Sequence, residues 1–202
     1  MSKKGGPPTR GRPKTLKRDH VLKTALMSYW ANSPSEVSIR EICEEAGASK
    51  PGLYREFGSD DGLKEAVLDA YSEMVSARRY DILASDEPFD VVLESLISHT
   101  TQDRRLQGVP DGCLLFTMRA QQGEFGPLTR KKIDQLRKIS LKKYRQWIDR
   151  AKSNGEFTAD ITTEVAALYI DAQIGSAMQM QKEGISNKLI AEILRTAFLV
   201  FR

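Results

Sequence analysis

One short segment constrains the fold of this chain more than any other: residues 37–63, which read VSIREICEEAGASKPGLYREFGSDDGL. Ser38 with Glu41 three residues later forms a capping box, in which each side chain satisfies a free backbone N–H at the start of a helix. A helix is therefore predicted from about Ser38 to Ala46. Its apolar positions recur at helical spacing on one face, and they are Ile39, Ile42, Cys43 and Ala46.

The residues after this helix predict a tight turn and a second, shorter helix. Gly47 can adopt the left-handed conformation that ends a helix without a Cβ penalty. Ser49 is a suitable N-cap for the next helix, and Lys50 and Pro51 fill its first turn, where the missing N–H of proline costs nothing. Its apolar side consists of Leu53, Tyr54 and Phe57. Two capped helices joined by a glycine turn form a helix-turn-helix, so DNA is the first partner to consider.

The run AGASKPGLYREF, followed by a serine-capped helix, resembles the signature of the TetR (tetracycline-repressor-like) family. That signature is roughly A-G-V-S-x-x-x-L-Y-x-H-F, and the matching residues here are Ala46, Gly47, Ser49, Leu53, Tyr54 and Phe57. The basic Gly-Arg-Pro-Lys stretch at residues 11–14, the length and the helical remainder also resemble family members. The alternative is an unrelated helical protein in which the two helices only pack.

The resemblance implies an all-α fold of about nine helices. An N-terminal three-helix helix-turn-helix domain would bind DNA, and a C-terminal helical domain would bind a ligand and form the dimer. We expect a flexible basic arm at residues 1–16, the DNA-binding domain at 17–62, and the ligand-binding and dimerisation domain at 63–202.

Apolar periodicity outside the motif predicts helices and no strands. One helix over residues 17–32 should pack across the motif. Ser59 caps a long helix that runs to near Leu83, with Asp60 and Asp61 at its positive end. The predicted buried positions of this long helix are Leu63, Ala66, Val67, Ala70, Tyr71 and Met74. Further helices are expected over residues 89–100, 113–121, 127–154, 163–183 and 186–201.

Composition excludes several classes of protein. No run of eighteen apolar residues and no apolar N-terminal segment occurs, which predicts a soluble cytoplasmic protein without a membrane partner. Cys43 and Cys113 lie far apart and without metal-ligand spacing, so we expect no disulfide, no metal and no cofactor. With two histidines, no phosphate loop and no nucleophile–base set, the chain offers no catalytic constellation, and we do not expect an enzyme.

Positive charge is concentrated before the first helix. The net charge is +4, but residues 1–18 hold seven lysines and arginines and no acid, so the remainder of the chain is −3. This Gly/Pro/Lys/Arg-rich arm cannot bury enough apolar surface to order itself. It is either a solubilising tail or an arm that follows phosphates and enters the minor groove, with Arg10 and Arg12 as the groove residues.

A small set of side chains is predicted to contact DNA. Arg40 matches a position where the family places an arginine against a base, and Lys50 opens the recognition helix, whose first residues reach base edges. Tyr54 either donates to a phosphate or is a core tyrosine. The complete predicted set is Arg10, Arg12, Lys14, Ser38, Arg40, Ser49, Lys50, Pro51, Gly52, Tyr54 and Arg55.

The sequence departs from the family pattern at two positions near the expected phosphate backbone. Glu56 replaces a histidine, and Asp60 stands where the family often has lysine. Residues 19–60 hold four cations and seven carboxylates, a net charge of −3. Attraction to DNA is therefore expected to come mostly from the basic arm, with Arg55 as the cation that can restore a phosphate contact, together with the backbone N–H groups at the Ser59 helix start.

The last two predicted helices carry more apolar and small residues than one core needs, which indicates a second covered surface. In the TetR family these helices form a four-helix interface between two subunits, so a homodimer is expected here. The residues concerned are Val165, Ala166, Ala167, Leu168, Tyr169, Ala172, Ile174, Gly175, Ala177 and Met178, and Leu189, Ile190, Ile193, Leu194, Ala197, Phe198, Leu199, Val200 and Phe201.

The family resemblance also implies an unknown small-molecule effector in the helical domain. The candidate pocket residues are Tyr71, Phe89, Leu93, Leu96, His99, Phe116, Arg119, Trp147 and Tyr169, each equally explained as ordinary core. Cys113, at a predicted helix start, is either an electrophile sensor or, as we favour, a buried structural cysteine. The lysine-rich side of residues 127–154 is interpreted as a solvated helix face rather than a nucleic-acid patch.

The predicted function is a sequence-specific transcriptional regulator: a dimeric repressor that binds a double-stranded DNA operator, an inverted repeat, and is released by a small molecule. The alternatives are a ligand-independent DNA-binding or architectural protein, and an activator of the same family.

Overall fold

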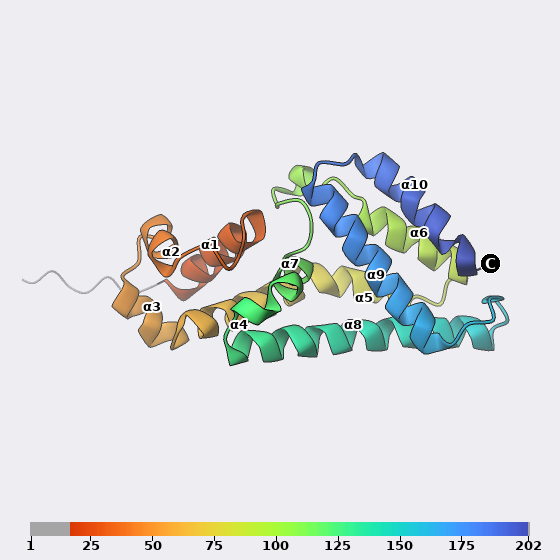
Figure 1. Cartoon of the computed structure of the whole chain (residues 1–202), viewed down its shortest axis with the longest axis horizontal. Coiled ribbons are helices and arrows are strands. Elements are labelled where there is room, and N and C mark those ends of the chain that lie inside the picture. The colour runs from red at the N-terminus through yellow and green to blue at the C-terminus, as the bar shows by residue number, and fades with distance from the viewer. Residues whose placement is uncertain (1–16, 202) are drawn as a thin grey trace, which may run out of the picture.

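The computed structural model describes residues 17–201, which are helical almost throughout (Figure 1). Within this range there are ten α-helices and no strand, and α4, a π-helical turn and α5 continue without a break, so nine separate helices result. The all-α fold of about nine helices is confirmed. The helices are α1 (Arg18–Ala31), α2 (Ile39–Glu45), α3 (Lys50–Phe57), α4 (Asp60–Tyr71), α5 (Ala77–Ala84), α6 (Phe89–Thr100), α7 (Leu114–Ala120), α8 (Pro127–Ser153), α9 (Thr163–Lys182) and α10 (Asn187–Phe198).

The predicted helix starts of the motif are present. Ser38 Oγ accepts from Glu41 N at 3.2 Å while Glu41 Oε2 accepts from Ser38 N at 2.7 Å, which completes the capping box. Gly47 has φ +59° between α2 and α3, a value that favours glycine. The Ser49 and Ser59 side chains accept from Gly52 N and Gly62 N.

The long helix that begins at Asp60 changes its winding in the middle. Residues Ser72–Ser76 form a π-helical turn, which holds more residues than an α-helical one. The buried positions therefore move from Tyr71 to Ser76 and Leu83. The prediction that Met74 is buried was wrong, because the altered winding leaves this side chain 51% exposed.

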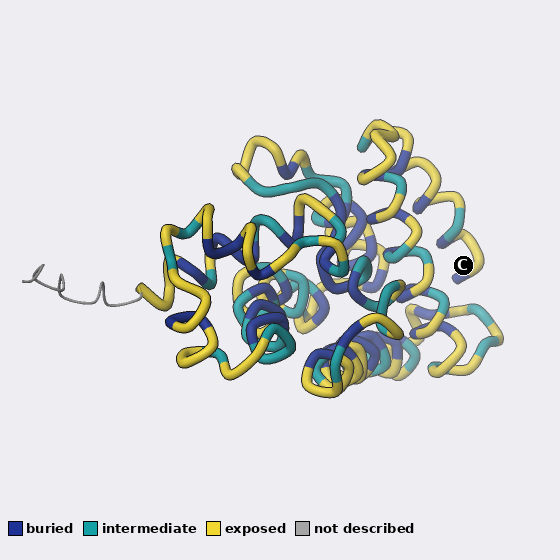
Figure 2. The backbone as a smooth tube through the Cα atoms, turned by 60° about the vertical axis from the view of Figure 1, so that its left-hand side comes forward, coloured by how far each residue is buried: buried dark blue, intermediate teal, exposed yellow. Residues whose placement is uncertain are grey.

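Two apolar clusters form the core. One joins α1–α4 to α7 and the first half of α8, through residues such as Trp30, Leu53 and Ile133. The other joins α6, the second half of α8, α9 and α10, through residues such as Leu96, Trp147 and Ile174. In the tube view the buried positions gather where helices face one another, while the outer side of the C-terminal helix is exposed (Figure 2). Because the first cluster includes Leu114 and Ile133, the domain boundary after residue 62 remains a prediction.

Asp61 connects the starts of two long helices. Its carboxylate accepts from Leu128 N at 2.8 Å and from Thr129 N at 3.0 Å, so it caps α8 as well as lying in the first turn of α4. A Cβ on Gly126 would overlap this carboxylate, which explains why glycine precedes α8. The helix that begins beside the recognition helix is therefore tied to the longest helix of the C-terminal half.

None of the helices described over residues 17–201 is both long and apolar enough to cross a membrane.

Candidate nucleic-acid interface and effector cavity

Helix α3 presents its first turn and one side to solvent. Lys50, Pro51, Tyr54 and Arg55 are exposed, and the Lys50 ammonium lies 5.5 Å from the centre of the Tyr54 ring. Leu53 is fully buried beneath them. Tyr54 is 36% exposed, which favours the phosphate-contact interpretation over a core tyrosine.

The remaining predicted DNA contacts have different surroundings. Arg40 is exposed in the first turn of α2 and pairs with Glu44 at 2.7 Å. Ser38 and Ser49 are exposed, and their hydroxyls cap α2 and α3, whereas Gly52 is buried. The predicted arm residues Arg10, Arg12 and Lys14 lie outside the described residues.

Both acidic departures from the family signature have a cationic partner. Glu56 pairs with Arg18 at 3.1 Å, and the Arg18 guanidinium also lies 5.3 Å from the centre of the Phe57 ring. Asp60 pairs with Lys64 at 2.6 Å. Because Arg18 and Lys64 flank residues 19–60, the net charge of −3 counted over that range overstates the repulsion toward phosphate. Neither of these two ion pairs was predicted from the sequence.

Lys64 is held in a buried position by the neighbouring helix. Its ammonium lies 5.1 Å from the centre of the Tyr29 ring, and the Tyr29 hydroxyl donates to Asp60 at 3.4 Å. Burial, with the adjacent Asp60 charge, raises the pKa of Tyr29 well above its ordinary value, so the phenol stays protonated and acts as a donor.

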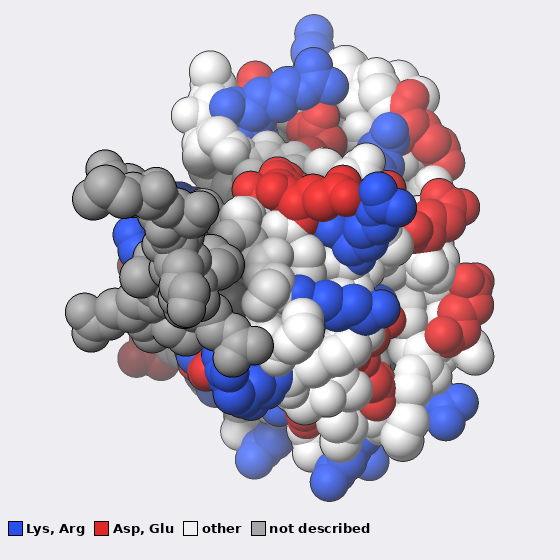
Figure 3. Space-filling view, turned by 90° about the vertical axis from the view of Figure 1, so that its left-hand side faces the viewer, with Lys and Arg blue, Asp and Glu red and all other residues white. Residues whose placement is uncertain are grey.

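The charges on this end of the molecule are mixed in sign. Seen from the end where α3 lies, lysine and arginine side chains are interspersed with acidic ones and form no continuous basic face (Figure 3). Electrostatic attraction of this visible face to DNA is therefore expected to be modest.

A cavity of about 20 Å³ lies among the helices that follow the helix-turn-helix. Its walls come from α4, α5 and the π turn between them, from α6, from the loop before α7, and from α7 and α9. The lining residues are Tyr71, Val75, Arg79, His99, Thr100, Arg104, Cys113, Phe116, Ile174 and Met178.

The structure brings only three of the nine predicted pocket residues to this cavity: Tyr71, His99 and Phe116. Arg119 stands beside it, bonded to Asp171 at 3.0 Å and stacked on Phe116. The other five belong to the second apolar core cluster, where Phe89 stacks on Trp147 with ring centres 4.8 Å apart. These five are Phe89, Leu93, Leu96, Trp147 and Tyr169.

Cys113 is buried in the wall of the cavity, where its thiol accepts from the Tyr71 hydroxyl at 3.0 Å. Burial raises the pKa of Tyr71, which keeps the phenol protonated as the donor. Both cysteines of the chain are free thiols.

Sequence reasoning missed the two arginines of the cavity. Arg79 lies on the continuation of the long helix, and Arg104 lies between α6 and α7. A loop arginine is ordinarily solvated, and no local pattern in the sequence distinguishes it from a buried one.

Six large apolar side chains remain exposed on α9, α10 and the short 3₁₀ turn that follows. They are Val165, Leu168, Leu189, Ile193, Leu199 and Val200. An apolar surface of this kind on the outer side of two adjacent helices indicates a contact with another protein surface.

The comparisons with known proteins agree with this geometry. Residues 21–67 match the family described as "Bacterial regulatory proteins, tetR family". The HTH-type transcriptional repressor ComR of Escherichia coli (strain K12) is 24% identical over 193 residues, which cover 93% of this chain and 90% of that protein.

Two solved structures share the fold of nearly the whole chain. A cysteine mutant of the TetR family transcriptional regulator CifR, complexed with 26bp double-strand operator DNA, has a TM-score of 0.78 at 21% identity, covering 95% of this chain and 100% of that one. The reduced form of E. coli NemR has a TM-score of 0.76 at 18% identity, covering 92% of this chain and 97% of that one. The capped helix-turn-helix at residues 21–67 therefore matches the tetR family of bacterial regulatory proteins, and the chain as a whole shares the fold of these two regulators.

Proposed function

We propose that this protein is a transcriptional repressor that binds a double-stranded DNA operator as a homodimer and is released by a small molecule in its C-terminal half. The observation that carries the proposal is the exposed first turn of α3, set on a buried Leu53 and preceded by two capped helix starts. The relative ComR is named a transcriptional repressor, and CifR is complexed with operator DNA, which supports the same role here.

The exposed residues divide into two groups by chemistry. Lys50 at the start of α3 and Arg40 in the first turn of α2 are suited to base edges, since cationic side chains pair with guanine in the major groove. Tyr54 and Arg55 are suited to phosphates, which position a protein without specifying sequence. The arm residues Arg10, Arg12 and Lys14 would follow the backbone into the minor groove.

The exposed apolar side chains of α9 and α10 support the dimer. A dimer formed there would cover the exposed side chains of Leu168, Leu189 and Ile193. Its two-fold symmetry would present two recognition helices to DNA. The operator would then be an inverted repeat with half-sites about one turn of DNA apart. Binding to DNA also implies a cytoplasmic location and a role other than catalysis.

Footprinting together with light scattering tests this proposal. The wild type should be a dimer that protects an inverted repeat. Ile193→Glu places a charge on the proposed dimer face and should give a monomer without a footprint, whereas Leu106→Glu, at a residue exposed in the loop after α6, should change neither result. A monomeric wild type, or protection of a directly repeated site, would contradict the proposal.

Random competitor DNA separates the repressor from an architectural protein. A footprint that survives excess random DNA at physiological salt indicates sequence reading, because non-specific binding is almost entirely electrostatic. Loss of the footprint under these conditions would favour the architectural alternative.

A further inference from the structure

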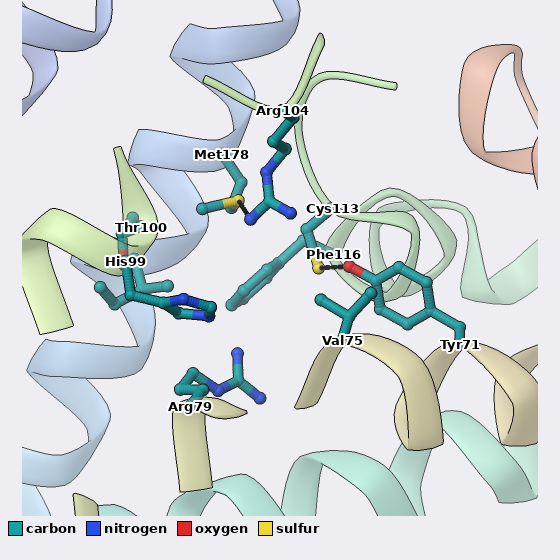
Figure 4. Close-up of a pocket in the computed structure, with 10 residues that line it drawn as sticks. Tyr71, Val75, Arg79, His99, Thr100, Arg104, Cys113, Phe116 and Met178 are labelled. Carbon is teal, nitrogen blue, oxygen red and sulfur yellow. Dashed lines mark hydrogen bonds between the residues drawn. The ribbon is translucent and has the colours of Figure 1, made fainter. Parts of the chain in front are cut away.

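The cavity contains two guanidinium groups that come from separate parts of the fold. Arg79 reaches it from α5, and Arg104 reaches it from the loop after α6 on the opposite side. The close-up shows both groups directed toward the space between them (Figure 4). Arg104 is only 4% exposed, and the Nε atoms of both arginines are buried without a hydrogen-bond partner among the described residues.

The partners recorded for these two groups are all uncharged. Arg79 Nη2 donates to Ser140 Oγ at 3.1 Å, and Arg104 Nη2 donates to the Met178 sulfur at 3.6 Å, a weak acceptor. No aspartate or glutamate from residues 17–201 lines the cavity. Asp171, the buried carboxylate of α9, is already paired with Arg119 and, at 3.9 Å, with Arg137. Buried cations without an anion are costly, so the arrangement requires a reason.

The positive charges of the nearby arginines also affect the pKa of His99. Burial, followed by the charges of Arg104, Arg79 and Arg78, lowers its pKa to about 4. At neutral pH the imidazole is therefore uncharged, and its buried Nδ1 has no partner in the described part of the chain. It can supply one further hydrogen bond to a group placed between the two arginines.

We propose that this cavity binds the carboxylate of a small organic acid, held between Arg79 and Arg104. A carboxylate accepts planar, paired hydrogen bonds from guanidinium groups and brings a single negative charge. A phosphate monoester brings close to two, which are harder to desolvate against the apolar wall of Val75, Phe116 and Ile174. The inference rests on the proposed function, because it names the chemical class of the effector.

Entry of the carboxylate requires a small rearrangement, since about 20 Å³ holds little more than one water molecule. Met178 is the side chain suited to move, because its unbranched thioether adapts readily and its sulfur is the acceptor that a carboxylate oxygen would replace. The exchange substitutes a charge-assisted hydrogen bond for a weak one at the same Arg104 nitrogen.

Arg104 also connects the cavity to the DNA-binding half. Its guanidinium lies 5.9 Å from the centre of the Trp30 ring of α1, and Trp30 Nε1 donates to the Gly112 carbonyl at 3.3 Å. A carboxylate that draws Arg104 toward the cavity therefore acts on a core residue of α1. We call the predicted DNA-binding domain at residues 17–62 the reading head. Through the contact between Arg104 and Trp30, the acid would bind more tightly at one position of the reading head than at another. A ligand must have such a difference in affinity to shift a protein between two states.

Thermal unfolding with matched variants tests the proposal. The probes are acetate and benzoate, their neutral counterparts acetamide and benzamide, and inorganic phosphate, all at constant ionic strength. Arg79→Met and Arg104→Met remove the cavity cations, and Arg105→Met removes the exposed neighbouring charge as a control. At ten times the Kd, a carboxylate should raise the Tm of the wild type and of Arg105→Met by about 4 °C.

Either cavity variant should weaken carboxylate binding by about tenfold or more, and the amides should have no effect on any protein. Without added anion, Arg104→Met should unfold at a temperature no lower than the wild type, because a methionine replaces an uncompensated buried charge. A purely structural arginine would instead give a lower Tm. Equal stabilisation of the wild type and both cavity variants, or none of the wild type, would overturn the proposal, and stabilisation by phosphate alone would overturn the assignment to a carboxylate.

A footprint measured on the same samples separates this inference from the proposed function. A wild type that fails to protect DNA without anion would refute the repressor but leave the carboxylate binding result standing. A footprint that persists at saturating benzoate, while Arg105→Met and the wild type are both stabilised by benzoate, would refute the effector role of the site.

Discussion

The reading head and the cavity differ in whether their charged side chains have partners of opposite charge. On the reading head, Glu56 is paired with Arg18 and Asp60 with Lys64, so acids that look unfavourable in the sequence are compensated by neighbours. In the cavity, Arg104 is buried, the Nε atoms of Arg79 and Arg104 are buried without a hydrogen-bond partner, and no acid among the described residues lines the site beside them. Paired charges near a surface cost little, whereas unpaired buried charges are costly, and this cost is the basis of the proposed carboxylate site.

The reading head and the basic arm before it are expected to contribute differently to DNA binding. The described surface of the reading head is mixed in charge, so it can supply shape and a few specific contacts. The sequence places the long-range attraction in the arm at residues 1–18, which carries seven cations and no acid. The following predictions separate these contributions, from the largest expected effect to the smallest.

Deletion of residues 1–14 should have the largest effect. This removes five cations, and each phosphate that is no longer neutralised reduces the slope of log affinity against log salt by about 0.9. Affinity for operator DNA should fall by about 100-fold at physiological salt. Fluorescence anisotropy over a salt series measures both quantities, and a truncated protein with an unchanged slope would show that the arm is only a tail.

Trp30→Phe should weaken the link between the two regions. The Gly112 carbonyl would lose its donor, so unfolding in urea should reveal a loss of about 2 kcal/mol. Trp147→Phe is the matched control, because the indole nitrogen of Trp147 has no hydrogen-bond partner among the described residues. Trp147→Phe should cost about 1 kcal/mol less and should retain release of DNA by carboxylate. Equal losses in the two variants would argue against the role of the Trp30 hydrogen bond.

Asp61→Asn should weaken the connection between α4 and α8 by about 1–2 kcal/mol, since a charged acceptor of two backbone N–H groups becomes neutral. Burial raises the pKa of Asp61, but hydrogen bonds from Thr129 and Leu128 outweigh it and leave this pKa below its ordinary value of 3.8.

The sign of the resulting pH dependence follows from that shift. The Asp61 contribution to stability is complete above its unfolded-state pKa and disappears as the pH falls through the lower folded-state value. The difference in unfolding free energy between the wild type and Asp61→Asn should therefore shrink below about pH 4. A difference that stays constant from pH 7 to pH 3 would contradict the proposed cap.

Tyr54→Phe should have the smallest effect. Loss of one phosphate hydrogen bond corresponds to about 1 kcal/mol, or about fivefold in affinity. The salt slope should not change, because a phenol carries no charge, and stability should change little, because the Tyr54 side chain is exposed. A marked loss of stability would instead indicate that Tyr54 is a core residue.

Much of the reading head was predictable because its signals are local. Ser38, Ser49 and Ser59 each cap a helix by bonding to a backbone N–H three residues away, and Gly47 takes the positive φ that a helix end requires. Exposure of Lys50 and Arg55 follows from the same short helix, since the buried Leu53 fixes which side faces inward. Interactions within one helical turn depend little on the rest of the chain.

The cavity was less predictable because aromatic and aliphatic residues serve equally in a core and in a pocket. Tyr71, His99 and Phe116 do line the cavity, but Phe89, Leu93, Leu96, Trp147 and Tyr169 pack in the second core cluster. Periodicity identified these residues as buried and could not specify which void they surround. The π turn at Ser72–Ser76, which exposes Met74, has no local sequence signature either.

By itself, then, the sequence determined the helical class, the capped helix-turn-helix and its resemblance to the tetR family signature, because these depend on the order of residues within a few turns. Only the tertiary structure decided that Asp61 caps α8, 67 residues away in the chain, and that Arg79 and Arg104 meet in one buried space. The physical reason is that burial and charge pairing depend on distances through space, and these are set when α1, α4, α8 and α9 pack together.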